Sequence, residues 1–110
     1  MNLKRDIVAM LYDERRRSER MLRAFESEAE KLPKGSLIRK RRGERVYFYL
    51  SYRENGRAVC RYIPADRAAV TGDEIERRKR LKEDIREIRY GIKVLDRALK
   101  GEPLPAEADG

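Results

Sequence analysis

The spacing of the apolar residues changes twice along this chain, from a helical period near each end to a period of two in the middle. In residues 3–32 the apolar side chains recur at spacings of three, four and seven. Residues 73–100 carry a cleaner stripe with the 4-3-4-3-4 spacing of a heptad seam, formed by Leu81, Ile85, Ile88, Ile92, Leu95 and Leu99. Two long amphipathic helices are predicted, and their similar length favours an antiparallel, coiled-coil-like hairpin.

Turn and cap residues predict where these helices begin and end. Pro33 stops the first helix, and Thr71 followed by Glu74 forms a capping-box pattern at the start of the second. Residues 64–70 are expected to form a turn or a short helix. Residues 101–110 are expected to form a disordered tail.

Between the helices the pattern is typical of strands. Three runs, Ser36–Lys40, Arg45–Arg53 and Arg57–Ile63, are separated by turn signals at Arg42-Gly43 and Asn55-Gly56. They predict a three-stranded antiparallel meander. The fold class is therefore α+β. We expect one domain over residues 1–100, in which a helix is followed by the sheet (36–63) and then by a second helix.

The turn at Asn55-Gly56 also predicts a register, in which Tyr49 lies opposite Tyr62. Strand alternation then divides the sheet into two faces. The inner face, expected to cover the helices, contains Leu37, Val46, Phe48, Leu50, Tyr52, Val59 and Ile63. The outer face is aromatic and basic, and contains Lys40, Tyr47, Tyr49, Ser51, Arg53, Cys60 and Tyr62. Cys60 is interpreted as a small packing residue.

The net charge of +8 is concentrated in the middle of the chain. Residues 33–72 contain ten Lys or Arg against three Asp or Glu, a net charge of +7, whereas residues 1–32 and 73–110 are almost balanced. Such an asymmetry attracts phosphates or acidic protein surfaces. The partner is therefore expected to contact the predicted sheet.

Arginines supply phosphate contacts and tyrosines supply stacking surfaces for bases. The candidate nucleic-acid-binding residues are Lys34, Arg39, Lys40, Arg41, Arg42, Arg45, Tyr47, Tyr49, Arg53, Arg57 and Tyr62. The alternative is an ordinary cross-strand Tyr49–Tyr62 pair on a solubilising surface. The second basic run, Arg77–Lys82, is interpreted as a solvated helix surface because neighbouring carboxylates neutralise it.

Composition excludes several classes of function. With no His and a single Cys, the chain lacks the residues for Cys/His metal sites, disulfide frameworks and imidazole acid/base catalysis. Gly43 and Gly56 are turn glycines and not parts of a phosphate loop. No apolar run is long enough to span a membrane, and the first ten residues do not resemble a signal peptide. We therefore expect a soluble, cytoplasmic, non-enzymatic protein without metal or cofactor.

The segment from Leu32 to Pro64 resembles a family of small uncharacterised bacterial and archaeal proteins. The resemblance rests on Gly35-Ser36-Leu37, Tyr47-Phe48-Tyr49-Leu50, Tyr52-Arg53, Gly56 and Tyr62-Ile63-Pro64. It implies the helix, three-stranded sheet, helix architecture and no settled activity. Some relatives insert a Cys-containing segment where this chain has Arg39–Arg45, so no metal site is carried over.

A weaker resemblance is to the arm-binding domain of tyrosine integrases, a three-stranded sheet followed by a helix. Residues Gly35–Lys40, the Tyr-rich second strand and Tyr52-Arg53 through Gly56 are similar in kind. The long first helix and the missing catalytic domain depart from that pattern. The resemblance implies a docking mode, with a sheet face in the DNA groove and turn arginines on phosphates.

These observations predict a nucleic-acid-binding module, for DNA in the first place, of the kind found in mobile elements or small regulators. The alternative is a phage or mobile-element inhibitor or adaptor whose basic sheet docks on an acidic protein surface. Residues 13–20 lack apolar side chains although they would lie opposite Ile88 in a simple hairpin. Either the sheet or a second copy of the chain, in a homodimer formed through the helices, would then cover that part of the seam.

Overall fold

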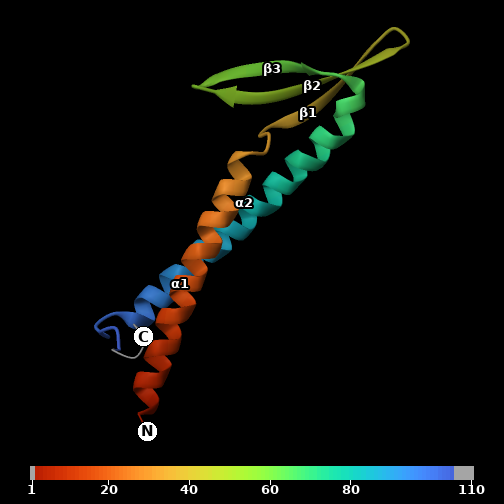
Figure 1. Ribbon diagram of the computed structural model, residues 1–110. Helices are drawn as coiled ribbons and strands as arrows, with labels where there is room; N and C mark the ends of the chain where they lie inside the picture. The colour runs from red at the N-terminus through yellow and green to blue at the C-terminus, as the bar shows by residue number, and fades with distance from the viewer. Residues whose placement is uncertain (1, 106–110) are drawn as a thin grey trace. The chain divides into compact units, whose positions relative to one another are not determined.

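The computed structural model describes residues 2–105 and contains two helices and three strands (Figure 1). In chain order the elements are α1 (Leu3–Glu30), β1 (Ser36–Arg42), β2 (Arg45–Glu54), β3 (Arg57–Ile63) and α2 (Ala65–Leu99). This order confirms the α+β fold class. The chain forms two compact units: a sheet unit, Glu28–Leu81, and a helical unit made of the residues up to Ser27 and those from Lys82 onward.

In the sheet unit the strands pair in the order β1-β2-β3, all antiparallel. Tyr49 lies opposite Tyr62 and Tyr52 opposite Val59, as the turn predicted. Asn55 and Gly56 have φ angles of 51° and 79°, the two successive positive values that a tight hairpin turn of type I′ requires. The sequence therefore predicted the register of this hairpin correctly.

One face of the sheet packs against α2. Leu50 is only 2% exposed and forms the centre of a small core with Ile63 and Ile75, the last of these from α2. Leu37, Phe48 and Tyr52 pack around this core, so the predicted inner face is confirmed at these positions. Cys60 is exposed, and its interpretation as a packing residue was wrong because it points away from that core.

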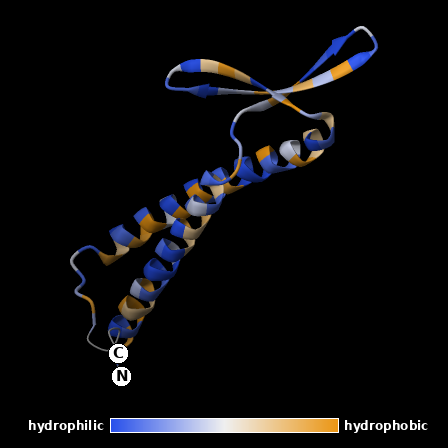
Figure 2. Ribbon diagram, turned by 45° about the horizontal axis from the view of Figure 1, so that its top comes forward, coloured by the Kyte–Doolittle hydropathy of each residue, from blue (hydrophilic) through white to orange (hydrophobic). Residues whose placement is uncertain are grey.

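In the helical unit, α1 and α2 run antiparallel and contact each other, with hydrophilic and hydrophobic residues alternating along both (Figure 2). Ile85 and Leu99 are buried, whereas the seam positions between them, Ile88, Ile92 and Leu95, are half-buried. The heptad stripe is therefore the packed side of α2, but its middle is covered incompletely.

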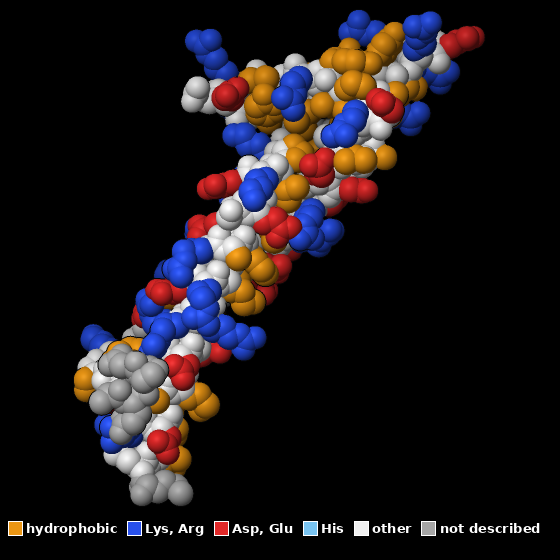
Figure 3. Space-filling model, viewed as in Figure 1, with side chains coloured by type: hydrophobic (Ala, Val, Ile, Leu, Met, Phe, Trp, Pro, Cys, Tyr) orange, Lys and Arg blue, Asp and Glu red, His pale blue; other side chains and the backbone are white. Residues whose placement is uncertain are grey.

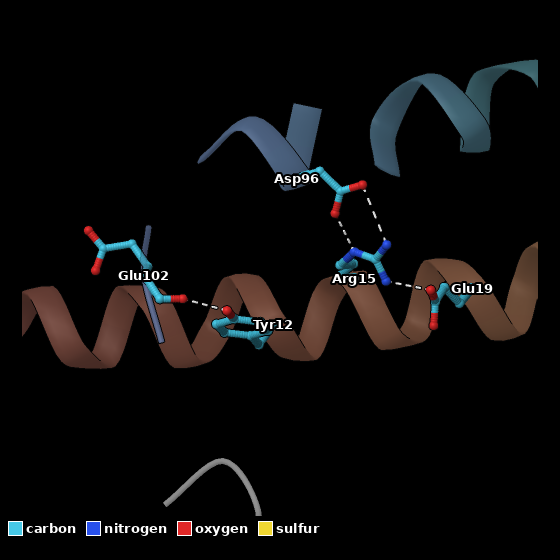
Figure 4. Close-up of polar contacts among 5 residues, drawn as sticks. All are labelled: Tyr12, Arg15, Glu19, Asp96 and Glu102. Carbon is cyan, nitrogen blue, oxygen red and sulfur yellow. Dashed lines mark hydrogen bonds and ion pairs between the residues drawn. The ribbon is translucent and has the colours of Figure 1, made fainter. Parts of the chain in front are cut away.

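The polar stretch 13–20 of α1 contacts α2 through an ion pair. Arg15 donates from Nε to Asp96 Oδ1 at 2.5 Å and also bonds Glu19 on its own helix (Figure 4). These hydrogen bonds raise the pKa of Arg15 and lower that of Asp96. Nearer the end of the hairpin, the Tyr12 hydroxyl donates to the backbone carbonyl of Glu102 at 2.5 Å. Residues 101–105 thus include a contact to α1, and the predicted tail beyond 105 lies outside the described residues.

The second helix begins eight residues earlier than the predicted start at Asp73, directly after Pro64. Residues 65–70 contain three alanines, and Asp66 lies in the first turn, where an acidic side chain favours the helix dipole. Thr71 is inside the helix, and its hydroxyl donates to the Arg67 carbonyl at 2.8 Å. The capping-box interpretation was wrong because this threonine bonds back along the helix.

The last turn of α1 has no basic residue of its own. Instead, Arg78 of α2 donates from Nη1 to the carbonyl oxygens of Ala29 at 2.7 Å and Leu32 at 3.2 Å. A cation at these carbonyls satisfies acceptors that the helix leaves open and opposes the negative end of its dipole.

Candidate nucleic-acid interface

The tyrosines of the outer sheet face form one cluster. The ring of Tyr62 lies 5.9 Å from Tyr49 in an edge-on arrangement and 6.5 Å from Tyr47, measured between ring centroids. Lys40 Nζ lies 5.4 Å from the centroid of the Tyr49 ring. Tyr62 is 53% exposed, whereas Tyr47 and Tyr49 are half-buried. The cluster therefore presents mainly the Tyr62 ring to solvent, and a cation lies over the neighbouring Tyr49 ring.

Over the sheet, Lys and Arg side chains lie among hydrophobic ones (Figure 3). Two arginines are held by their own turns: Arg41 Nε donates to the Gly43 carbonyl, and Arg53 Nη1 to the Gly56 carbonyl, each at 3.1 Å. Within residues 2–105, no carboxylate forms an ion pair with any of the candidate cations. Their charge is therefore available to an external anion.

The register divides the candidate residues over both faces of the sheet. Seven share the outer face: Lys40, Arg42, Arg45, Tyr47, Tyr49, Arg53 and Tyr62. Arg39, Arg41 and Arg57 lie on the face of Leu50, and Lys34 lies in the connection between α1 and β1. The structure thus brings most of the predicted residues onto one face, but it places two arginines of the densest basic cluster on the opposite face.

The hairpin of β1 and β2 extends beyond β3. β1 pairs with β2 from Ser36 to Arg42, whereas β3 pairs with β2 only from Phe48 to Glu54. Figure 1 shows the hairpin continuing past the end of the third strand. We call the segment Arg39–Phe48 the basic ribbon. It consists of two strands and a turn, and it carries cations on both faces.

Three cations from different parts of the chain lie together in a group that the sequence did not predict, although Lys34 was already a candidate residue. Lys34, Arg61 and Arg78 line a hollow of about 270 Å³ whose walls include Leu50 and Tyr52. Arg61 lies opposite Leu50 on the inner face, where alternation favours an apolar residue. An arginine at this inward-facing position was a sign in the sequence that the hollow exists. The sequence did not show that Arg78 also lines the hollow, because this depends on the packing of α2 against the sheet.

The basic run Arg77–Lys82 lies within α2, and two of its arginines contact the end of α1 or the residues that follow it. Arg77 bonds Glu28, Arg78 caps the end of α1, and Lys79 pairs with Glu76 at 3.4 Å. Three of these side chains therefore have partners within the protein. The run is not only a solvated helix surface, because two of its arginines also hold α2 to the end of α1.

Comparison with known protein families gives a match to part of the chain. A family model described as a domain of unknown function (DUF6788) matches residues 11–72, which include most of α1, the whole sheet and the start of α2. No curated protein and no solved structure matches. Among the described residues, no helix is long and apolar enough to cross a membrane. The resemblance to integrase arm-binding domains stays a prediction. Because the matched region spans more than half of the sequence, the chain belongs to this family of unknown function.

Proposed function

We propose that this chain is a non-enzymatic nucleic-acid-binding module that contacts phosphates through the cations of its sheet. The observation that carries the proposal is the segregation of charge. Residues 33–72 hold +7 of the net +8, and the described carboxylates leave the cations of the sheet unpaired. Phosphate neutralisation supplies most of the affinity of non-specific nucleic-acid binding.

The outer face adds a second element of recognition. Tyr62 offers an exposed ring beside Tyr49, whose own ring has Lys40 over it. Aromatic rings and arginines on a sheet stack on bases as well as bind phosphates. Cations together with exposed aromatic edges suit a nucleic acid better than an acidic protein surface, which needs only the charge.

Fluorescence anisotropy tests the proposal with labelled 20-mers of duplex and single-stranded DNA and RNA, at about 50 and 200 mM salt. If roughly five cations contact phosphates, log affinity for duplex DNA falls against log salt with a slope of about −4 to −5. Replacing Arg41 and Arg42 by Ala is expected to weaken binding to all sequences and to reduce the slope by about 2.

The matched control removes two positive charges from the exposed side of α1, through Arg20→Ala and Arg23→Ala. This variant has the same net charge as the sheet variant, so it separates local contact from global charge. It is expected to keep the slope of the unmodified chain. Failure to bind any of the four probes at micromolar protein in low salt would reject the proposal and favour an acidic protein partner.

A further inference from the structure

We infer that the preferred ligand is a B-form DNA duplex whose major groove receives the basic ribbon, Arg39–Phe48. This inference rests on the proposed function and names the form of nucleic acid that the sheet fits. The sequence predicted that one face of the three-stranded sheet contacts the nucleic acid. In this inference the two-stranded end of the β1–β2 hairpin enters the groove instead.

The dimensions of the ribbon favour this groove. A ribbon that enters tip first turns its two faces toward the two walls of the groove, and a sheet with side chains on both faces is roughly 10 Å thick. The major groove of B-form DNA is about 12 Å wide and admits a two-stranded β-ribbon, whereas the minor groove is about 6 Å wide. From the Arg39–Phe48 pair to the Arg42–Arg45 pair, the ribbon extends about 10 Å, which matches a groove depth of about 8.5 Å.

Both faces of the ribbon are exposed toward its turn. α2 covers the sheet around Leu50 and Ile63, but the residues from Arg39 to Arg45 are all exposed. Val46, on the covered side of the sheet, is half-buried and lines a hollow with Arg39, Arg41 and Glu44. Within the sheet unit, α2 therefore leaves this end of the hairpin uncovered.

The charge of the ribbon is also two-sided. Lys40, Arg42 and Arg45 lie on the outer face, and Arg39 and Arg41 lie on the opposite face. A flat footprint would use cations on one face only. A ribbon inserted into a groove has a phosphate backbone on each side, so cations on both faces find partners. Arginine at four of the five positions also permits bidentate contacts to guanine edges in that groove.

The same geometry disfavours other nucleic acids. The major groove of A-form RNA is deep and narrow, and side chains do not read it. Single strands are bound mainly through stacking on aromatic rings. In the ribbon, Tyr47 is half-buried against Tyr62, so it offers little free ring surface for a base.

Two double variants of equal charge test the insertion directly. One removes the cations of one face, Arg39→Ala with Arg41→Ala, and the other removes cations of the outer face, Lys40→Ala with Arg42→Ala. Insertion predicts that each weakens binding to a 20-base-pair DNA duplex by a similar factor of at least 10. The Arg20→Ala, Arg23→Ala variant is the control, and circular dichroism of each variant verifies that it is folded.

The probes supply an independent measurement on the unmodified chain. We expect the DNA duplex to bind at least tenfold tighter than an RNA duplex of the same sequence. Glucosylated 5-hydroxymethylcytosine, which fills the major groove, is expected to weaken binding at least tenfold. Netropsin, which fills the minor groove of an AT-rich duplex, is expected to have little effect.

The outcomes separate this inference from the proposed function. Equal affinity for RNA and DNA duplexes, indifference to the glucosyl groups, or loss of binding only in the outer-face variant would overturn insertion while leaving nucleic-acid binding intact. Failure to bind every probe would overturn both.

Discussion

The Arg15–Asp96 pair is a contact through which we expect the stability of the helical unit to depend on pH. Hydrogen bonding to Arg15 lowers the pKa of Asp96 below its usual value of about 3.9. A carboxylate with a lowered pKa in the folded state stabilises the fold above the unfolded pKa, and this contribution is lost as pH falls through the folded pKa. The pair should therefore stabilise the hairpin at neutral pH and fail below about pH 4.

Asp96→Asn is expected to lower the melting temperature at pH 5 to 7. The difference in melting temperature from the unmodified chain should become smaller as the pH falls below about 4. Thermal unfolding followed by circular dichroism across this range measures the difference. Asp84→Asn is the control, because Asp84 is exposed on the same helix and forms no ion pair within the described part of the chain. A pH-independent effect of Asp96→Asn would show that the carboxylate does not act through its charge.

Arg78 is the second residue with a specific polar role, through its hydrogen bonds to the carbonyls of Ala29 and Leu32. Arg78→Ala should lower the free energy of unfolding by about 2 kcal/mol, since hydrogen bonds to charged groups contribute about 1.5 to 3 kcal/mol. Arg78→Lys should recover only part of this loss, because one ammonium group lacks the fork of donors that reaches both carbonyls. Chemical denaturation provides the measurement, with exposed Arg80→Ala as the control. Equal losses at positions 78 and 80 would contradict the capping role.

At the scale of elements, the residues of the heptad seam of α2 differ in how deeply they are buried, and their contributions to stability should differ accordingly. Ile85 is 3% exposed, so Ile85→Ala should cost about 2 to 5 kcal/mol. Ile88→Ala should cost less, roughly 1 to 2 kcal/mol, because its side chain is only half-buried. Denaturant titration of the two variants measures the ratio. A larger loss at Ile88 would mean that something outside the described chain covers that position.

The entry into the sheet depends on one glycine. Gly35 has a φ of 109°, and a Cβ atom there would collide with the Ser51 carbonyl oxygen and lie 2.9 Å from Tyr52 Cβ. Gly35→Ala should therefore destabilise the sheet unit by more than about 2 kcal/mol.

Gly91→Ala is the matched control for this prediction. Gly91 lies inside α2, and a Cβ atom there has open space around it. Replacing a helical glycine by alanine should stabilise the chain by about 0.5 to 1 kcal/mol. Thermal unfolding compares the two variants, and similar melting temperatures would contradict the close approach at Gly35.

At the scale of the whole molecule, the first turns of α1 leave apolar side chains in solvent. Leu3 and Met10 are 68% and 62% exposed, and Ile7 between them is also exposed. We propose that a second copy of the chain packs on these residues, because their 4-3 spacing continues a heptad stripe. Light scattering should then give a molar mass near twice 13.0 kDa.

Charged substitutions test this dimer. Ile7→Glu with Met10→Glu should return the mass to that of one chain, whereas Arg20→Glu with Arg23→Glu should not. A mass of one chain for the unmodified protein, at concentrations up to about 100 µM, would reject self-association.

What the sequence determined by itself was local. Alternation and the Asn55-Gly56 turn specified the strands, the β2–β3 register and the two sheet faces, because side chains alternate strictly and two-residue turns leave little freedom. The heptad spacing likewise identified the packed side of α2. The start of α2 was predicted wrongly because Thr71 and Glu74 fit a cap as well as a helix interior, and local pattern does not separate the two.

Only the tertiary structure decided how distant segments meet. Arg78 caps α1 and Arg15 pairs with Asp96 because the helices fold back on each other, and each contact joins residues far apart in sequence. The extension of the basic ribbon past β3 likewise depends on where the third strand stops pairing. Charge and alternation placed cations in the middle of the chain, but pairing across strands decided which of them share a face and which face is left uncovered.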